Sequence, residues 1–313
     1  MIGTIVTHVS PDWDAITSVW LLQRYGGFES AGVVFVNTGS PDPAALAAAT
    51  AVADTGKVFD PSALRFDHHQ LPGKAASETC AALQVWEWLQ APQPEPLPAN
   101  SWRNGRSVVS VCISPLPDAT RHLEPLVRLV YDGDTGKPGA KQSRELGIHA
   151  LLSAQKAARW LGDHGLLAFG FDLLDMLASQ LLAQADARAS LAEHTVYTSQ
   201  DGLVVALYNA PPAATFAAQE AGARLVVFAD YAKNAIGIMR GGEGADVHAG
   251  ELVARAETFS WSSAALRAEL ATWFRHEAGF FAGRGTAKAP SATPILVSLV
   301  DVACAIDTAW VRK

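Results

Sequence analysis

The sequence has few cysteines, no strong excess of positive charge and no long uninterrupted apolar run. Its three cysteines, Cys80, Cys112 and Cys304, are too widely spaced for a disulfide framework or a zinc-binding pattern. We therefore expect reduced thiols, as is usual in the cytoplasm. The formal net charge is −7, from 24 Lys and Arg against 31 Asp and Glu. This balance argues against a protein that coats long duplex DNA.

The N-terminal segment lacks the basic and apolar stretches of a signal peptide, and no apolar run approaches the roughly 18 residues of a membrane span. We therefore expect a cytoplasmic protein without a membrane partner. Hydrophobic residues make up 49% of the chain and charged residues 18%, so buried cores can form. The length of 313 residues is typical of two domains.

Apolar β-branched runs alternate with helical patterns along the first part of the chain. The expected strands cover 2–8, 32–37, 51–53 and 64–66, and we expect the strand at 32–37 to be buried. The expected helices cover 15–25, 44–49 and 77–89. In the helix at 77–89, Ser77 is the expected cap and Gln84 is expected to face outward. This alternation predicts a parallel sheet with helices on both faces. Further helices are expected at 118–131, 143–162 and 166–193.

Strand patterns return at 203–208, 225–229 and 235–239, with helices near 216–222, 263–274 and 294–309. The chain is therefore expected to be α/β. We predict an N-terminal domain over 1–165, a linker helix over 166–195, and a smaller α/β domain over 196–313 that closes a cleft. The segment 91–105 contains four prolines and reads as a surface loop.

Several polar residues follow the predicted strands directly. His8, Asp12, Asp54 and His68 all fall near strand ends, where ligand-binding groups gather in parallel sheets. A divalent cation needs such converging oxygen and imidazole ligands. The structural alternative is that Asp12 caps a helix, with Asp14 in its first turn, and that Asp54 is an ordinary turn residue.

The tripeptide Asp67-His68-His69 offers a more specific signal. One imidazole can bind a metal ion, a neighbouring carboxylate can fix a ring tautomer, and the second imidazole is free to meet a phosphate or protonate a leaving oxygen. The alternative is a polar turn. A later turn, residues 131–137, places Asp134 among glycines, and Ser143 stands where a calcium loop of the EF-hand type would need Glu. We interpret Asp134 as a distal carboxylate of the same site.

The segments THVSPDWDA, VADTG, FDHHQ and GDTG, in this order, resemble the four motifs of the DHH phosphoesterase superfamily. That superfamily includes RecJ-type exonucleases, oligoribonucleases, cyclic-dinucleotide phosphodiesterases and family II inorganic pyrophosphatases. The resemblance covers residues 1–140. VADTGKVFDPSALRFDHHQ and FRHEAGFFAGRGTAKA are also similar to the melanocyte-proliferating-gene exonuclease branch.

This resemblance implies a centre with two divalent ions. His8 and Asp12 would hold one ion, Asp14, His68 and Asp134 the other, and Asp54 would bridge them. Mixed carboxylate and imidazole ligands favour Mn²⁺, with Mg²⁺ or Co²⁺ as alternatives. The catalytic residues would be Asp67, which orients an imidazole, and His69, which faces the substrate.

The resemblance also implies that the C-terminal domain grips the substrate. Arginine offers bidentate contacts to phosphate, and glycine allows close approach of the backbone. The candidates are Arg240, His276, Gly283, Arg284, Gly285, Thr286 and Lys288. For Arg240 and Lys288 the alternative is a solvated surface charge. Trp13, between two candidate ligands, could line the cleft or stack on a base.

The expected activity is that of a Mn²⁺-dependent phosphoesterase that cleaves short single-stranded oligonucleotides or related small nucleotides. The alternatives are a pyrophosphatase or polyphosphatase, a cyclic-dinucleotide phosphodiesterase, and a non-catalytic nucleotide sensor. The sequence leaves a homodimer open as an assembly.

Overall fold

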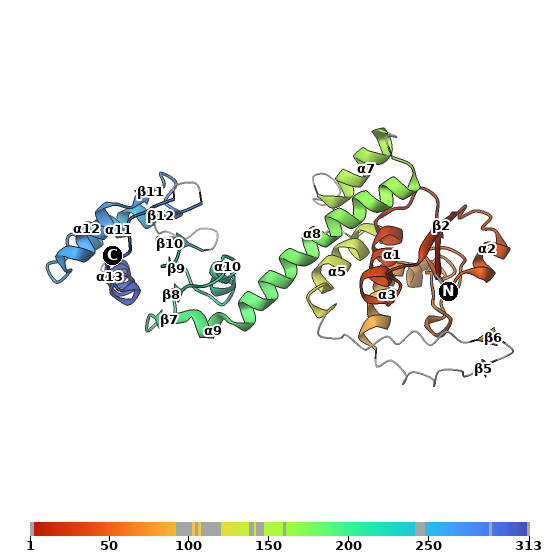
Figure 1. The fold of residues 1–313 in the computed structure, drawn as a ribbon, viewed down its shortest axis with the longest axis horizontal. Coiled ribbons are helices and arrows are strands. Elements are labelled where there is room, and N and C mark those ends of the chain that lie inside the picture. The colour runs from red at the N-terminus through yellow and green to blue at the C-terminus, as the bar shows by residue number, and fades with distance from the viewer. Residues whose placement is uncertain are drawn as a thin grey trace. The chain divides into compact units, whose positions relative to one another are not determined.

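The computed structural model describes residues 3–91, 102–103, 106–107, 120–137, 141, 147–158, 161–241, 248–287 and 290–311. The chain divides into two compact units, Met1–Leu181 and Leu182–Lys313 (Figure 1). The division falls within helix α8, Asp163–Ala189, inside the range expected for a linker helix. The predicted boundaries at 165 and 195, and the closing of a cleft, stay predictions.

Unit 1 contains a four-stranded sheet in the order β2-β1-β3-β4, and every neighbouring pair is parallel. The strands are β1 (Thr4–His8), β2 (Gly32–Val36), β3 (Ala51–Ala53) and β4 (Arg65–Phe66). This confirms the parallel sheet. β2 lies at the edge, where Gly32 and Val34 are exposed, so our expectation of a fully buried strand there was wrong.

Helices cover both faces of this sheet, as predicted. Along β1, Ile5 packs into the large core and Val6 into a small one, because successive side chains of a strand point to opposite faces. The large core is formed with α1 (Trp13–Tyr25), α3 (Ala81–Gln90), α5 (Glu124–Asp134) and α8, and the small core with α2 (Pro43–Ala48). Figure 1 shows α1 and α3 close together in unit 1, where they make many contacts.

Three local details differ from the sequence analysis. Residues Gly73–Glu78 form a 3₁₀ helix, and α3 starts only at Ala81, so Ser77 is not its cap. Gln84 of α3 is buried, not facing outward. α5 continues to Asp134, so the expected turn at 131–137 is helical in its first half.

The remaining elements of unit 1 are short or lie near its end. They are the 3₁₀ helix Pro61–Ala63, the antiparallel pair β5 (Trp102–Arg103) and β6 (Arg106–Ser107), and α7 (Ile148–Ala158). Most of the proline-rich segment 91–105 lies outside the described residues.

Within the described residues, α8 alone has the length and mean hydropathy, 1.5 over 18 residues, that a membrane-spanning helix would need. It nevertheless packs in the core of unit 1, to which it contributes Leu166, Leu167 and Leu174. Its Asp175 also accepts hydrogen bonds from Trp20 and Arg24 of α1. One third of its apolar 18-residue window is buried in the structure.

Unit 2 is a second α/β unit with a six-stranded sheet in the order β11-β12-β10-β9-β8-β7. Only the β8–β9 pair is parallel among its described strands. The strands are β7 (Thr195–Thr198), β8 (Val204–Tyr208), β9 (Leu225–Asp230), β10 (Ala235–Arg240), β11 (Phe274–Arg275) and β12 (Phe281–Arg284). Its helices are α9 (Leu191–His194), α10 (Ala213–Glu220), α11 (Ala249–Glu257), α12 (Ala264–Ala271) and α13 (Leu299–Val311).

Candidate metal centre

The turn after β1 brings three candidate ligands together. His8, the last residue of β1, places its Nε2 at 3.1 Å from Oδ2 of Asp54 and 3.9 Å from Oδ1 of Asp12. Its Nδ1 lies 2.8 Å from the carbonyl oxygen of Val9, which orients the ring. Asp12 also caps α1, since its Oδ1 accepts hydrogen bonds from the amides of Asp14 and Ala15. Asp12 is therefore a helix cap as well as a candidate ligand. Only its Oδ1 is used in the cap, and Oδ2 is not.

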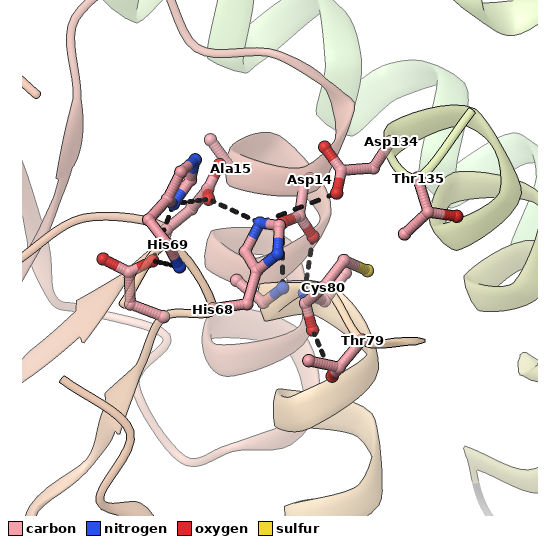
Figure 2. A network of polar contacts seen from close by, with 12 residues as sticks. Asp14, Ala15, His68, His69, Thr79, Cys80, Asp134 and Thr135 are labelled. Atoms are coloured by element: carbon pink, nitrogen blue, oxygen red, sulfur yellow. Dashed lines mark hydrogen bonds and ion pairs between the residues drawn. The ribbon is translucent and has the colours of Figure 1, made fainter. Parts of the chain in front are cut away.

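His68 faces three carboxylates. Its Nε2 lies 3.6 Å from Oδ2 of Asp134 and 3.7 Å from Oδ2 of Asp14 (Figure 2). It also lies 3.8 Å from Oδ1 of Asp54. Its Nδ1 lies 3.2 Å from the carbonyl oxygen of Ala76. Such a carbonyl partner keeps a proton on Nδ1 and leaves the Nε2 lone pair for a metal ion.

Asp14 is the most deeply buried of these carboxylates. Its two oxygens accept hydrogen bonds from the first amides of α3, at 2.8 Å from Ala81 and 2.6 Å from Ala82. Burial, followed by the charge of Asp54 and those of two further carboxylates, raises the pKa of Asp14 well above its usual range. The N-terminus of α3 opposes this shift, because amide donors stabilise the ionised form.

The pKa values of His8 and Asp134 are also perturbed. Burial alone would lower the pKa of His8, but the hydrogen bond and the charge of Asp54 raise it to about 9. Burial raises the pKa of Asp134 to about 6, with His68 opposing the shift and Asp12 adding to it. In the metal-free protein these carboxylates repel one another, and a divalent cation among them would favour their ionised forms.

His69 and Asp67 form a hydrogen-bonded pair at the edge of the cluster, where Nδ1 of His69 also lies 3.6 Å from Oδ1 of Asp54. The Nδ1 and the backbone amide of His69 lie 2.7 and 2.9 Å from Oδ1 of the buried Asp67. The other oxygen, Oδ2, accepts a hydrogen bond from the amide of Lys57. The hydrogen bond to Asp67, opposed by burial, raises the pKa of His69. Its imidazole is half exposed, and its Nε2 makes no hydrogen bond to the described residues.

The donor set fits divalent cations. Asp54 Oδ1 and His68 Nε2 are both buried and have no hydrogen-bond partner among the described residues, although buried polar atoms are normally paired. Ligand atoms of His8, Asp12 and Asp54 lie within 4.8 Å of one another, as do those of Asp14, His68 and Asp134. The resemblance implied these two groups. A third group, Asp54, His68 and His69, meets the same distance criterion and was not expected. That each residue binds an ion stays a prediction.

A cavity of about 240 Å³ adjoins this cluster and includes residues that the sequence analysis missed. Its lining includes Asp12, Asp14 and Asp134 together with His149, Ser153 and Lys156 of α7. The sequence predicted a helix there but carried no signal for its orientation. Trp13 also lines the cavity, but it is buried and donates its Nε1 hydrogen to the carbonyl of Ile148, so its ring is not open to stack on a base.

The candidate substrate residues of unit 2 lie at two ends of β12. Arg240 and His276 lie near its start, where their backbone amides donate to the carbonyls of Phe280 and Phe281. Gly283 and Arg284 are at its other end, and Gly285 follows beside Asn234. The His276 ring packs on Phe280 with 4.1 Å between centroids. Gly285 adopts a left-handed φ of 72°, and Thr286 follows it. Lys288 lies outside the described residues.

The expectation that Arg284 binds the substrate is corrected by its contacts within unit 2. Its Nε and Nη2 contact the two carboxylate oxygens of Glu269 at 2.5 and 2.8 Å, and only 9% of its side chain is exposed. Its other donors are bound by the carbonyls of Thr293 and Pro294 and the hydroxyl of Ser291. A guanidinium group has five N–H donors, and here they are used within unit 2. The structure thus gives Arg284 a structural role and leaves no donor for a substrate.

Two solved structures align with nearly the whole chain at low similarity. The crystal structure of an uncharacterized protein from Helicobacter pylori G27 aligns over 99% of both chains, with 14% identity and a TM-score of 0.27. RecJ from Thermus thermophilus, crystallised in complex with Mn²⁺, aligns over 99% of this chain and 52% of its own, with 17% identity and a TM-score of 0.29. No curated protein matches the chain significantly.

Residues 4–82 match the family model MYG1_exonuc, which is described as an uncharacterised protein family (UPF0160). The matched stretch runs from β1 to the start of α3 and contains His8, Asp12, Asp14, Asp54 and Asp67-His68-His69. That family is DHH-like, so the resemblance of this stretch to the DHH phosphoesterases is confirmed.

Proposed function

We propose that this protein is a Mn²⁺-dependent phosphoesterase that uses two metal ions to hydrolyse phosphodiester bonds of short oligonucleotides or related nucleotides. The observation that carries the proposal is the geometry around His68, whose Nε2 has no hydrogen-bond partner among the described residues and lies 3.6–3.8 Å from three carboxylates. Hydrogen-bond partners would lie closer to it, and a shared cation accounts for the spacing. The family match over residues 4–82 supports the same class of activity.

In this proposal His8, Asp12 and Asp54 hold one ion, and Asp14, His68 and Asp134 hold the other, with Asp54 shared. The four carboxylates carry a charge that two divalent ions neutralise. Bound there, the ions supply Lewis acidity toward water and the phosphoryl oxygens. Imidazole and carboxylate donors suit Mn²⁺.

The residues outside the two ligand groups serve proton transfer. Asp67 fixes the ring of His69 through Nδ1 and raises its pKa, so the imidazolium form persists at higher pH. The exposed Nε2 edge is then a proton donor for the leaving oxygen. His69 therefore acts as general acid, and Asp67 orients it.

The test is a substrate panel with the purified full chain and Mn²⁺. Dinucleotides, pentanucleotides, cyclic dinucleotides and pyrophosphate are compared by product analysis, with His69→Gln as a variant that keeps both ligand groups. We expect the short linear oligonucleotides to be cleaved fastest and His69→Gln to slow their turnover without loss of metal.

A preference for pyrophosphate or cyclic dinucleotides would replace the substrate proposed here. Binding of nucleotides without any turnover would indicate a sensor and would refute the enzymatic proposal.

A further inference from the structure

The cavity beside the ligand cluster has an unusual distribution of charge. Three aspartates, Asp12, Asp14 and Asp134, lie on its wall, and Lys156 is the one lysine or arginine among its described lining residues. An anionic substrate in this cavity therefore meets carboxylates that metal ions would neutralise and, on the α7 side, the ammonium group of Lys156.

Lys156 is held in place from the α1 side. Its Nζ donates a hydrogen bond of 2.7 Å to the carbonyl oxygen of Ser10, in the turn between β1 and α1. At the other end of α7, Trp13 donates to the carbonyl of Ile148 at 2.9 Å. α7 is thus fixed to the same turn that carries Asp12. An ammonium group has three donors, so two remain beyond the bond to Ser10.

Ser153 lies one helical turn before Lys156 and lines the same cavity. Residues three apart share one face of a helix, so the hydroxyl and the ammonium are neighbours. Ser153 is exposed, and its hydroxyl makes no hydrogen bond to the described residues. Together the two side chains offer several donors to one anionic group.

We propose that Lys156 and Ser153 bind a second phosphate of the substrate, next to the phosphate that reacts at the metal centre. This inference rests on the proposed function and narrows it: the preferred substrates carry two neighbouring phosphates, as a 5′-phosphorylated dinucleotide does. Without a cation on this wall, the second phosphate would lie beside carboxylates with no opposite charge of its own. A lysine ammonium paired with a hydroxyl suits a phosphate oxygen.

Binding to the Mn²⁺-loaded full chain tests the proposal independently of turnover. Calorimetry compares two dinucleotides in which a methylene group replaces the leaving oxygen of the linkage, so that neither is hydrolysed. One carries a 5′-phosphate and has two anionic groups, and the other lacks the 5′-phosphate and has one. We expect Lys156→Met to weaken binding of the 5′-phosphorylated analogue by about tenfold or more and binding of the unphosphorylated analogue by less than about twofold. Ser153→Ala should weaken binding of the 5′-phosphorylated analogue about threefold, and it leaves the bond between Lys156 and Ser10 intact.

Lys74→Met is the matched control, because the Lys74 side chain is 90% exposed and pairs only with Glu78 on the surface among the described residues. It should change neither affinity. Equal weakening of both probes by Lys156→Met, with no effect of Ser153→Ala, would show that Lys156 only holds the Ser10 turn and would overturn the proposal. Unchanged binding in both variants, or equal affinity of the wild type for the two analogues, would overturn it as well.

Hydrolysis separates this inference from the proposed function. Wild type should cleave a 5′-phosphorylated dinucleotide more efficiently than its unphosphorylated form, and Lys156→Met should remove that preference by raising KM. Selective binding of the 5′-phosphorylated analogue without hydrolysis of any substrate would refute the phosphoesterase and leave the phosphate site standing. Hydrolysis of both dinucleotides at equal efficiency would refute the phosphate site and leave the phosphoesterase standing.

Discussion

The carboxylate of Asp163, at the start of α8, accepts a 2.8 Å hydrogen bond from the backbone amide of Ser10 across 153 positions of sequence. Ser10 adopts a left-handed φ of 53°, a conformation that non-glycine residues reach only at a cost in free energy. Lys156 binds the carbonyl of the same residue. The turn between His8 and Asp12 is therefore fixed on both sides by residues far along the chain.

Removing the Asp163 carboxylate should loosen this turn and weaken the ion held by His8 and Asp12. We expect Asp163→Ala to lower the Mn²⁺ affinity of one site by about tenfold, the value of one charge-assisted hydrogen bond, and to leave the other site unchanged. Titration of the metal-free protein with Mn²⁺, followed by calorimetry, measures the affinity of both sites. Asp172→Ala, an exposed carboxylate on the same helix, is the control. Unaltered affinity at both sites would contradict the positioning role.

The raised pKa of His8 predicts a particular pH dependence of the metal-free protein. Its pKa is about 9 in the folded chain against 6.5 for the free side chain, so the folded state binds the proton more tightly. The resulting stabilisation is complete below pH 6.5 and is lost as the pH rises through 9. Wild type should therefore lose stability over this interval relative to His8→Gln, as measured by urea unfolding.

The same shift predicts that Mn²⁺ binding displaces a proton from His8, since only the neutral ring can bind a metal ion. Calorimetry near about pH 8 in two buffers of different ionisation enthalpy should show about one proton more released by wild type than by His8→Gln. Equal proton release by the two proteins would show that His8 does not bind the ion.

His68 should be indispensable because it faces three carboxylates. We expect His68→Ala to reduce turnover by at least about 100-fold and to remove one of two bound Mn²⁺ ions, measured by elemental analysis. His194→Ala in unit 2, whose ring contacts the carbonyl of Tyr208, serves as the control. Activity within about threefold of wild type would argue against the assigned ligand.

Removal of metal should destabilise unit 1 selectively. Ions that bind only the folded state stabilise it by about 2.7 kcal/mol when their concentration is 100 times Kd. EDTA should therefore lower the Tm of the transition that belongs to unit 1, while the transition of unit 2 stays in place, as followed by scanning calorimetry. A uniform shift, or no shift, would be inconsistent with ligands confined to residues before 140.

The buried pair of Arg284 and Glu269 should matter for stability. We expect Arg284→Met to destabilise unit 2 by about 3–5 kcal/mol, because it leaves a buried carboxylate without its partner. The double variant Arg284→Met/Glu269→Met should recover part of this loss in urea unfolding. Arg188→Met, which breaks an exposed pair with Glu220, should have little effect. Unchanged stability in Arg284→Met would instead return Arg284 to the substrate-binding candidates.

Local sequence patterns were sufficient for the sheet of unit 1 and for the set of residues that gather beside it. β1 ends at His8, Asp54 directly follows β3, and the DHH tripeptide directly follows β4, and parallel strands bring their carboxyl ends to one edge. Asp134 joins them from the end of α5. The strands of unit 2 were predicted less completely, because β11 and β12 are short and are defined mainly by their pairing with β10.

Only the tertiary structure showed which distant side chains line the site and which candidate residues lie elsewhere. Lys156 and Asp163 meet Ser10 across 146 and 153 positions, and no local pattern encodes the docking of α7 and α8 on the β1–α1 turn. Arg284 looks like a phosphate-binding residue among glycines, but packing places Glu269 against it. Residue type and spacing thus determined the candidate chemistry, since they depend on neighbours in sequence. Burial and partner choice depend on how distant elements pack, and only the folded chain fixes them.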